Sequence, residues 1–266
     1  MRTDDPEAHL APETARPCSL SVAVLSWNHA ATVEAAVRHV HGALADEGID
    51  FEVLVVDDAS TDRTPEIVRR LSRDIGGVSL VCHPRHRGPG SGIRTGIRMF
   101  TKEAFTYYAA DMHGSFAERL RHLGRLARDA DVLVGQRPDR RGASAWQRMT
   151  STAFSRAMRA LYGLPLLDYD FFYFFTRAVL EAVEPASQTG FVCPEIAVRA
   201  LDLGFRVVPV AGWARPRPAR TPTGRGAGHL ARLTAEMTAL WAERELAETR
   251  RLAAAFPPRR DAPPRR

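Results

Sequence analysis

Two adjacent carboxylates at the end of an apolar run carry the strongest chemical signal in this sequence. Residues 53–56 read Val-Leu-Val-Val and lead directly into Asp57 and Asp58. An apolar run without polar alternation is typical of a strand buried on both faces of a parallel sheet. The carboxyl ends of such strands form the edge where open α/β sheets bind ligands. Because Asp111 follows another apolar segment, the pattern indicates a nucleotide site and a place for a metal ion.

The polar residues around these strand ends suit recognition of a nucleoside. Asn28 and Ser26, at the end of an earlier apolar run, can hydrogen-bond the edge of a base, and Asp58 can accept a hydrogen bond from a ring N–H. A simpler role is also open, because Asp58 and Ser60 could cap the helix expected to begin near Thr64. The two roles are compatible.

A glycine-rich segment, residues 86–96, precedes and opens a further predicted helix. Glycine lets the backbone approach a ligand closely, and the N-terminus of a helix favours anions. Gly90 and Arg94 are therefore candidates for contact with a phosphate. A plain tight turn at Gly90 and an outward-facing Arg94 are the alternatives.

Alternating strand and helix patterns place these residues in an α/β fold with a doubly wound, mostly parallel central sheet and helices on both faces. Strands are expected near 20–25, 51–57, 78–82, 105–110 and 131–135, and helices near 31–46, 63–75, 91–104 and 116–129. The rhythm then changes. We expect a helix at 144–162, an aromatic strand at 168–176, helices at 177–183 and 193–203, and an edge strand at 205–210.

The end of the chain reads as a helical extension. A Pro/Arg/Gly/Thr loop at 214–228 precedes a helix at 229–253 with one apolar face. That face suits packing on the domain or on a second copy in a homodimer, and peripheral contact with a membrane is the alternative. Residues 1–18 and 256–266 are predicted to be disordered tails.

The composition of the chain limits the kinds of partner that the protein can bind and indicates its cellular compartment. The chain of 266 residues has a net charge of +6 but no basic stripe interleaved with aromatics, which argues against nucleic acid. The three cysteines are far apart and read as reduced thiols of a cytoplasmic protein. The N-terminus lacks a signal-peptide pattern, and no apolar run is long enough to span a membrane.

Three segments in order resemble the motifs of one known family. Residues 21–29 resemble an opening strand with a proline-x-tyrosine-asparagine-glutamate turn, residues 57–62 match Asp-Asp-Gly-Ser-Thr-Asp, and residues 86–96 match Asn-x-Gly-x-Gly-x-Ala-x-Arg-x-Gly. The chain thus resembles family 2 glycosyltransferases of the GT-A fold, most closely their polyprenyl-phosphate (dolichol-phosphate) mannosyl- or glucosyltransferase branch. The resemblance implies a GT-A domain over residues 19–220, followed by a loop and an amphipathic helix over 221–255.

The resemblance also implies a metal site, with one departure. Asp111-Met112-His113 stands where the family has Asp-x-Asp. A cation on a diphosphate prefers oxygen ligands, so Asp111 suits Mg²⁺ or Mn²⁺. An imidazole ligand from His113 shifts the preference toward Mn²⁺. Alternatively, Asp111 caps the next helix and His113 is an ordinary loop residue.

Two arginines can face the diphosphate or a phosphorylated acceptor. Arg137 follows Gly135-Gln136 and resembles the family's Gly-x-Arg, and Arg148 stands where relatives carry a basic helix residue. Either can form paired hydrogen bonds with a phosphate.

The segment that the family uses near its acceptor has changed. Where relatives read Asp-x-x-x-Gly-Phe-Arg, this chain has Phe172 and Phe174 in place of the glycine and the arginine. Asp168 aligns with the family's aspartate, and Asp170 is an additional carboxylate. Transfer to a hydroxyl group needs a general base, for which either aspartate qualifies. A phosphate acceptor is already a nucleophile and needs none.

The sequence therefore predicts an inverting, metal-assisted glycosyltransferase that takes a nucleotide-diphospho-sugar donor. The acceptor is a polyprenyl phosphate or a small hydroxylated molecule. The enzyme is expected in the cytoplasm, with peripheral contact at the inner face of the membrane as the alternative. A degenerate GT-A domain that binds nucleotide or sugar without catalysis is the alternative. An NAD-dependent dehydrogenase is disfavoured, because Trp27-Asn28-His29 stands where its Gly-x-Gly-x-x-Gly would follow the first strand.

Overall fold

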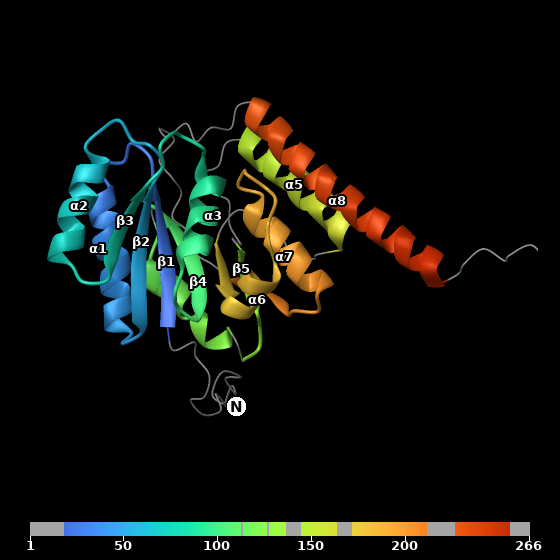
Figure 1. Ribbon diagram of the computed structural model, residues 1–266, viewed down its shortest axis with the longest axis horizontal. Helices are drawn as coiled ribbons and strands as arrows, with labels where there is room; N and C mark the ends of the chain where they lie inside the picture. Colours follow the sequence, from blue (N-terminus) through green and yellow to red (C-terminus); the bar gives the residue numbers. More distant parts are fainter. Residues whose placement is uncertain are drawn as a thin grey trace, which may run out of the picture.

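The computed structural model describes residues 19–112, 114–126, 128–136, 145–163, 172–211 and 227–255. Figure 1 shows one α/β body from which the last helix extends. The tails predicted at 1–18 and 256–266 lie outside the described residues. So do residues 214–226 of the loop predicted at 214–228, whose last two residues belong to the final helix.

The centre of the fold is a seven-stranded sheet in the order β3-β2-β1-β4-β6-β5-β7. The strands are β1 (Ser19–Ser26), β2 (Asp50–Asp57), β3 (Val78–Cys82), β4 (Ala104–Ala109), β5 (Val132–Gln136), β6 (Tyr173–Thr176) and β7 (Val207–Ala211). All neighbours pair in parallel except β6, which runs antiparallel to β4 and β5. The predicted α/β class with a mostly parallel sheet is confirmed.

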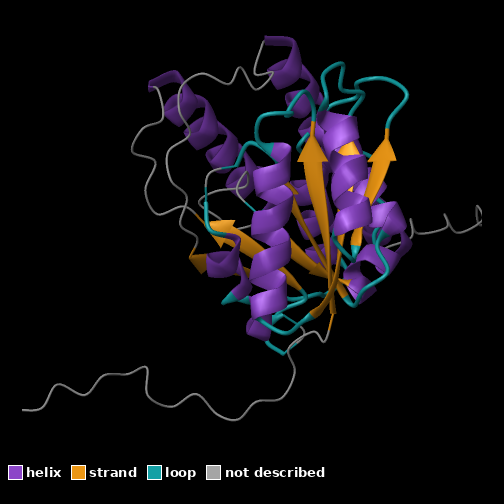
Figure 2. Ribbon diagram, turned by 90° about the vertical axis from the view of Figure 1, so that its left-hand side faces the viewer, coloured by secondary structure: helices purple, strands orange, loops and turns teal. Residues whose placement is uncertain are grey.

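Helices cover both faces of this sheet, as Figures 1 and 2 show. They are α1 (Val33–Asp46), α2 (Thr64–Asp74), α3 (Pro89–Met99), α4 (Phe116–Leu120), α5 (Ala145–Tyr162), α6 (Arg177–Ala182), α7 (Val192–Asp202) and α8 (Ala227–Ala255). One apolar cluster joins α1, α2 and α4 to the sheet, and a second joins the opposite face to α3, α6 and α7. A strand with both faces covered must be apolar on both, and β1 is buried along its whole length.

Alternate residues of β1 therefore belong to different cores. Val22 and Val24 lie in the first cluster, whereas Ala23 and Leu25 lie in the second. The register pairs Ser26 at the end of β1 with Asp57 at the end of β2. The loops that carry the predicted site consequently meet at one edge of the sheet, beyond the strand arrowheads in Figure 2.

Two predicted helices are wrong in length. The helix predicted at 91–104 ends at Met99, and β4 begins at Ala104. Instead of a helix over 116–129, α4 ends at Leu120 and a short 3-10 turn follows at Leu123–Arg125. Gly124 lies in this turn, and glycine weakens a helix interior. Leu126 then adopts an extended conformation, which places its side chain in the core. Burial of the leucines, rather than continuation of the helix, decides the backbone here.

The C-terminal helix is tied to the domain through polar and apolar contacts. Met237 and Leu240 of α8 are buried in the second core, and the Tyr162 hydroxyl of α5 donates to the Met237 carbonyl. The far end of α8 projects beyond the sheet in Figure 1. None of the described helices combines the length and apolar character needed to cross a membrane.

Candidate active site

Asn28 ties the turn after β1 to the turn after β2. Its side-chain oxygen accepts hydrogen bonds from the Thr61 amide at 2.8 Å and the Thr61 hydroxyl at 3.3 Å. The backbone amide of Asn28 donates to the Ser60 hydroxyl at 2.8 Å. Asn28 has a φ of +55°, which asparagine tolerates better than most residues. The side chain is exposed at the edge of the sheet where we predicted nucleoside contact.

Asp57 shapes the following turn from inside the protein. Its carboxylate is buried and accepts from the Ser60 amide at 3.0 Å and the Ser60 hydroxyl at 2.5 Å. The Ser26 hydroxyl approaches the same carboxylate at a long 3.4 Å. Asp57 and Ser26 thus lie at the predicted edge and hold its backbone in place.

The start of α2 is held by Asp62 and not by Asp58. The Asp62 carboxylate accepts from the Thr64 amide and hydroxyl at 3.0 and 2.5 Å. Desolvation acts to raise the pKa of Asp62, but the hydrogen bonds from Thr64 and Ala30 outweigh it and lower the pKa below its usual value. The capping alternative considered for Asp58 therefore belongs to Asp62.

Asp58 instead organises the loop between β3 and α3. Its carboxylate accepts from the Gly88 amide at 2.7 Å and from the Arg87 amide at 3.0 and 3.1 Å. Two imidazoles complete the shell: His83 Nδ1 lies 2.7 Å from one oxygen, and His86 Nδ1 lies 2.8 Å from the other. A carboxylate this well supplied with donors is fixed in one orientation.

The two histidines have different surroundings. The His83 side chain is 7% exposed, and its Nε2 atom lies 2.8 Å from the Thr95 hydroxyl of α3. The His86 side chain is 48% exposed, and its ring packs on Trp27 at a tilt of 30° with centroids 4.1 Å apart. Trp27 follows β1 directly and is itself 45% exposed. An aromatic surface therefore adjoins Asp58 at the edge of the sheet.

Glycines in α3 allow close packing against protein. A Cβ atom on Gly90 would lie 2.1 Å from the Thr189 carbonyl oxygen, and one on Gly92 would lie 2.9 Å from Leu25. Leu25 stands where the family has proline and Gly92 where it has alanine, so the two departures fit one another. The close approach predicted at Gly90 is made to the loop before α7. Contact of Gly90 with a donor remains a prediction.

Arg94 points to the same loop. Its guanidinium donates to the carbonyl of Pro185 and, at 3.4 Å, to that of Ser187. The outward-facing alternative does not describe this position, and contact of Arg94 with a phosphate remains a prediction. Arg94 connects α3 to the loop before α7, and a phosphate contact would require it to leave these carbonyls.

Two glutamates from different helices hold the other side of this loop. Glu195 of α7 is buried and accepts from the amides of Ala186 and Ser187 at 3.0 and 2.8 Å. Glu236 of α8 accepts from the Gln188 amide at 2.8 Å and the Thr189 hydroxyl at 2.5 Å. The C-terminal helix thereby supports the loop against which Gly90 packs.

Glu195 is ionised more easily than a free glutamate. Burial acts to raise its pKa, but hydrogen bonds from Ser187, Ala186 and Arg199 prevail, and the pKa is lowered. Arg199 also pairs with Glu243 of α8 at 2.7 Å.

Asp111 lies one strand away from the Asp58 network. It follows β4, and the Ala110 amide donates to the Leu25 carbonyl at 2.9 Å, so Asp111 lies beside the end of β1. Ser115, not Asp111, caps α4, because its hydroxyl accepts from the Glu118 amide at 3.3 Å. Within the described part of the chain, no three His, Cys, Asp or Glu side chains form a group that could hold a metal ion. His113, the predicted second ligand, lies outside the described residues.

A buried arginine lies beneath the Asp111 loop. Arg119 contacts the Met112 sulfur, and its guanidinium lies 5.1 Å from the ring centres of both Tyr108 and Phe172. Burial lowers the pKa of Arg119 to about 10, while Tyr108 and Tyr107 oppose the shift. The Tyr108 hydroxyl lies 3.0 Å from the carbonyls of Met112 and Gly114, which fixes the loop on either side of the predicted metal position.

On the acceptor side, the structure shows what replaced the family's glycine and arginine. Phe172 and Phe174 are both fully buried, with ring centres 5.8 Å apart at 81°. A Cβ atom on Gly135 would lie 2.3 Å from the Phe172 ring, so this glycine makes room for the aromatic side chain. Since Phe174 belongs to the core, this position of β6 offers no charge to an acceptor.

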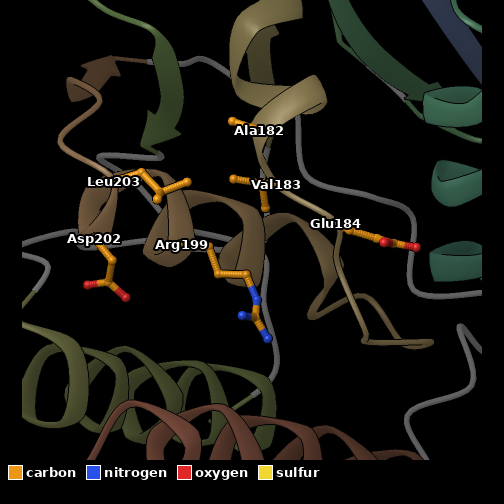
Figure 3. Close-up of a pocket in the computed structure, with 6 residues that line it drawn as sticks. All are labelled: Ala182, Val183, Glu184, Arg199, Asp202 and Leu203. Carbon is orange, nitrogen blue, oxygen red and sulfur yellow. The ribbon is translucent and has the colours of Figure 1, made fainter. Parts of the chain in front are cut away.

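Several predicted residues cannot be placed in the site. Asp168, Asp170 and Arg137 lie outside the described residues, and of Arg148 only the backbone, within α5, is described. A shallow pocket of about 260 Å³ does occur elsewhere, lined by Ala182, Val183, Glu184, Arg199, Asp202 and Leu203. Figure 3 shows that these residues come from the end of α6, the segment after it, α7 and the residue that follows α7. The pocket contains none of the predicted site residues.

Sequence reasoning missed the partners of Asp58. His83 directly follows β3, which neighbours β2, so the rule that selected Asp58 could have selected His83 as well. No local pattern marks Glu236, because its contact with Thr189 spans 47 residues. Arg119 reads as a surface residue of a helix, and only its burial reveals its position.

An open, mostly parallel sheet with carboxylates at nearby strand ends is typical of α/β proteins that bind a ligand at that edge. The chain belongs to glycosyl transferase family 2, whose sequence model matches residues 21–197. The predicted family is thereby confirmed.

Relatives agree with the predicted branch of the family. The chain is 28% identical over 180 residues to the undecaprenyl-phosphate 4-deoxy-4-formamido-L-arabinose transferase of Pseudomonas paraeruginosa, which covers 67% of this chain and 53% of the relative. It is 28% identical over 214 residues to the glycosyltransferase AglD of Haloferax volcanii, covering 76% of this chain and 34% of that protein. The matches thus span about half or less of these relatives.

Solved structures share the fold at low sequence identity. The mannosyltransferase PcManGT of Pyrobaculum calidifontis, in complex with GDP-Man and Mn²⁺, has a TM-score of 0.60 at 23% identity and covers 85% of this chain and 66% of that one. Glucosyl-3-phosphoglycerate synthase of Mycobacterium tuberculosis, with Mn²⁺, UDP and phosphoglyceric acid, has a TM-score of 0.63 at 18% identity, covering 82% and 78%. The GT-A fold is confirmed.

Proposed function

We propose that this protein transfers a sugar from a nucleotide-diphospho-sugar donor to an acceptor, assisted by a divalent cation. The observation that carries the proposal is the placement of Asp58 and Asp111 at the ends of β2 and β4, on either side of β1. This arrangement offers one carboxylate near a nucleoside and another near a diphosphate. Neighbours of the same fold were solved with GDP-Man or UDP and Mn²⁺.

Residues after β1 and β2 would hold the nucleoside. Trp27 offers a ring face on which a base can stack, and Asn28 and Asp58 offer polar atoms toward its edge. Asp57 and Ser26 keep the turn in shape. Gly90 lies in the first turn of α3, where the helix N-terminus favours the diphosphate. Arg94 would reach a phosphate only by leaving the carbonyls of Pro185 and Ser187.

The residues present fit a cation that is held mainly by the diphosphate itself. Asp111 supplies a carboxylate oxygen, which Mg²⁺ and Mn²⁺ both accept, and His113 would add a nitrogen ligand that favours Mn²⁺. When bound, the cation neutralises the charge of the leaving diphosphate. Asp111 would orient it, and the buried Arg119 and Tyr108 would hold the Asp111 loop in place.

Transfer would proceed by one inverting displacement at the anomeric carbon. For a hydroxyl acceptor, Asp168 or Asp170 would take the proton of the attacking oxygen. For a polyprenyl phosphate no base is needed, and Arg137 and Arg148 would face the phosphate groups. The relatives named as undecaprenyl-phosphate transferases favour the lipid, whereas the buried Phe174 in place of arginine favours the smaller acceptor.

A GT-A domain that binds nucleotide or sugar without catalysis is the second candidate. The same buried Phe174 and the Asp-x-His sequence at the metal position support it. Donor hydrolysis and transfer, measured with Mn²⁺ and with Mg²⁺, separate the two. Turnover that Asp111→Ala abolishes supports the enzyme, whereas nucleotide binding without turnover on either class of acceptor supports the binding domain.

Peripheral contact with the inner face of the membrane and a homodimer remain predictions. Flotation of the full chain with vesicles that contain anionic lipid tests the first. Sedimentation equilibrium tests the second.

A further inference from the structure

We propose that His86 occupies the place of the nucleobase in the free protein and must leave when the donor binds. The inference rests on the proposed function, because it concerns the base of a nucleotide-diphospho-sugar. It follows from three features: the hydrogen-bond shell of Asp58, the unequal burial of its donors, and the stack between His86 and Trp27.

The first feature is that the Asp58 carboxylate has no acceptor position to spare. An ionised carboxylate has about four lone-pair sites. Four donors surround this one, namely the amides of Arg87 and Gly88 and the imidazoles of His83 and His86. An incoming base that donates a ring N–H to Asp58 must therefore displace one of them.

The four hydrogen-bond donors to Asp58 differ in burial, and this difference shows which one an incoming base can displace. Arg87 and Gly88 donate from the backbone, so moving either would rebuild the turn that opens α3. His83 is held at both ring nitrogens, by Asp58 and by the Thr95 hydroxyl, and its side chain is 7% exposed. The His86 side chain is 48% exposed and can rotate into solvent.

The geometry of His86 reproduces the two contacts that a base would make here. Its flat heteroaromatic ring lies on Trp27 with centroids 4.1 Å apart and an interplanar angle of 30°. Its Nδ1 atom lies 2.8 Å from the Asp58 carboxylate. A pyrimidine or purine that stacks on Trp27 and donates a ring N–H to Asp58 would compete with this ring for both partners.

His83 keeps Asp58 in position after His86 leaves. His83 Nδ1 lies 2.7 Å from Asp58 and its Nε2 lies 2.8 Å from the Thr95 hydroxyl, so both ring nitrogens hold the imidazole in place. Asp58 then retains three of its four hydrogen-bond donors and has one acceptor site free for the base. The sugar nucleotide thus binds by replacing the His86 ring on Trp27 with its own base.

The test is a calorimetric titration of the full-length protein with UDP, GDP and dTDP in Mn²⁺. Replacing His86 with alanine removes both competing contacts, so His86→Ala should bind the preferred nucleotide about five- to tenfold more tightly than the wild type. His86→Phe keeps a ring on Trp27 but cannot donate to Asp58, so its gain should be smaller, about two- to threefold. The expected order of affinity is His86→Ala, His86→Phe, wild type.

Controls separate the base from the rest of the site and from the fold. Arg85→Lys changes an exposed neighbour in the same loop and should bind as the wild type does. Pyrophosphate, which has no base, should bind wild type and His86→Ala equally. If His86→Ala fails to fold, His86→Asn, which carries the family's residue, should show the gain instead.

The outcomes distinguish this inference from the proposed function. Nucleotide binding that is unchanged or weaker in His86→Ala, with His86→Phe at least as tight as wild type, would show that His86 is part of the platform for the base and overturn the inference alone. Failure of every nucleotide to bind both wild type and His86→Ala would overturn the donor proposal as well. Binding gained only in His86→Ala supports both.

Discussion

The two halves of the sheet edge differ in how far their residues depart from those of the family. Over β2 and β1, polar side chains at the strand ends are held by hydrogen bonds to neighbouring loops, with Asp58 at the centre. After β4, Asp111 keeps the family's first aspartate, whereas His113 replaces the second. Over β6 and β5, aromatic side chains have replaced a glycine and an arginine and joined the core. The comparison teaches that the donor half is a built polar site, whereas the acceptor half has been remodelled.

The remodelling extends to the residues that surround each change. Gly135 leaves space for Phe172, and Gly92 leaves space for Leu25. Reverting one residue of such a pair toward the family therefore breaks a packed contact.

Restoring the family's arginine on the acceptor side should unfold the protein rather than improve it. Phe174→Arg places a charge in a fully buried position of β6, and the free energy of unfolding should fall by about 4 kcal/mol. Denaturant unfolding measures this change. Phe174→Leu, which stays apolar, should cost only about 1.5 kcal/mol. A stable Phe174→Arg protein with improved transfer would show that the acceptor half is not remodelled.

On the donor side, the largest effect should come from Asp111. Asp111→Ala removes the described carboxylate at the predicted metal position, so turnover in Mn²⁺ should fall about 100-fold. Steady-state rates at saturating donor measure the loss. Asp74→Ala, an exposed carboxylate at the end of α2, serves as the control and should retain the wild-type rate. Equal rates for the two variants would remove Asp111 from the mechanism.

Substitution of Glu195 tests how much the contacts that hold the loop before α7, away from the sheet edge, stabilise the protein. Glu195→Gln loses the charge that accepts two backbone amides, and the free energy of unfolding at pH 7 should fall by about 2 kcal/mol. Because the folded-state pKa of Glu195 is lowered, its contribution is present above the unfolded pKa and is lost as the pH falls through the folded pKa. The wild type and the variant should therefore converge in stability below about pH 4. A difference that persists into acid would assign the effect to packing.

The smallest effect concerns the turn that carries the donor site. Ala59 has a φ of +60° where the family has glycine, a conformation that disfavours a Cβ atom. Ala59→Gly should raise the free energy of unfolding by about 0.5–1 kcal/mol without changing nucleotide affinity. Ala35→Gly, in the exposed face of α1, should lower it by a similar amount, about 1 kcal/mol. If Ala59→Gly instead destabilises the protein, the conformational entropy that glycine adds to the unfolded chain outweighs the backbone strain that it relieves.

The sequence predicted the fold well because the apolar runs of β1, β2 and β4 have no rival interpretation. Pro209 was correctly expected on an edge strand, since β7 ends the sheet. The helix at 116–129 was wrong because tertiary burial of Leu123 and Leu126 overrode the local pattern.

For the site, the sequence indicated which residues meet at the edge but not what each one contacts. Asp58 was correctly placed at the end of β2, yet its four donors come from a loop about 25–30 residues away. Arg94 and Gly90 serve the loop before α7, a contact that no spacing in the sequence reveals. Long-range hydrogen bonds and close approaches of this kind need coordinates.

The central claim is that the Asp58 edge holds the nucleoside of a sugar-nucleotide donor. Calorimetric titration of UDP, GDP and dTDP in Mn²⁺ against the wild type and Asp58→Asn tests it most directly. The account predicts that at least one nucleotide binds the wild type and that Asp58→Asn, which loses an acceptor oxygen, weakens it about tenfold. Binding that Asp58→Asn leaves unchanged, or the absence of binding by all three nucleotides to both the wild type and His86→Ala, would contradict the account.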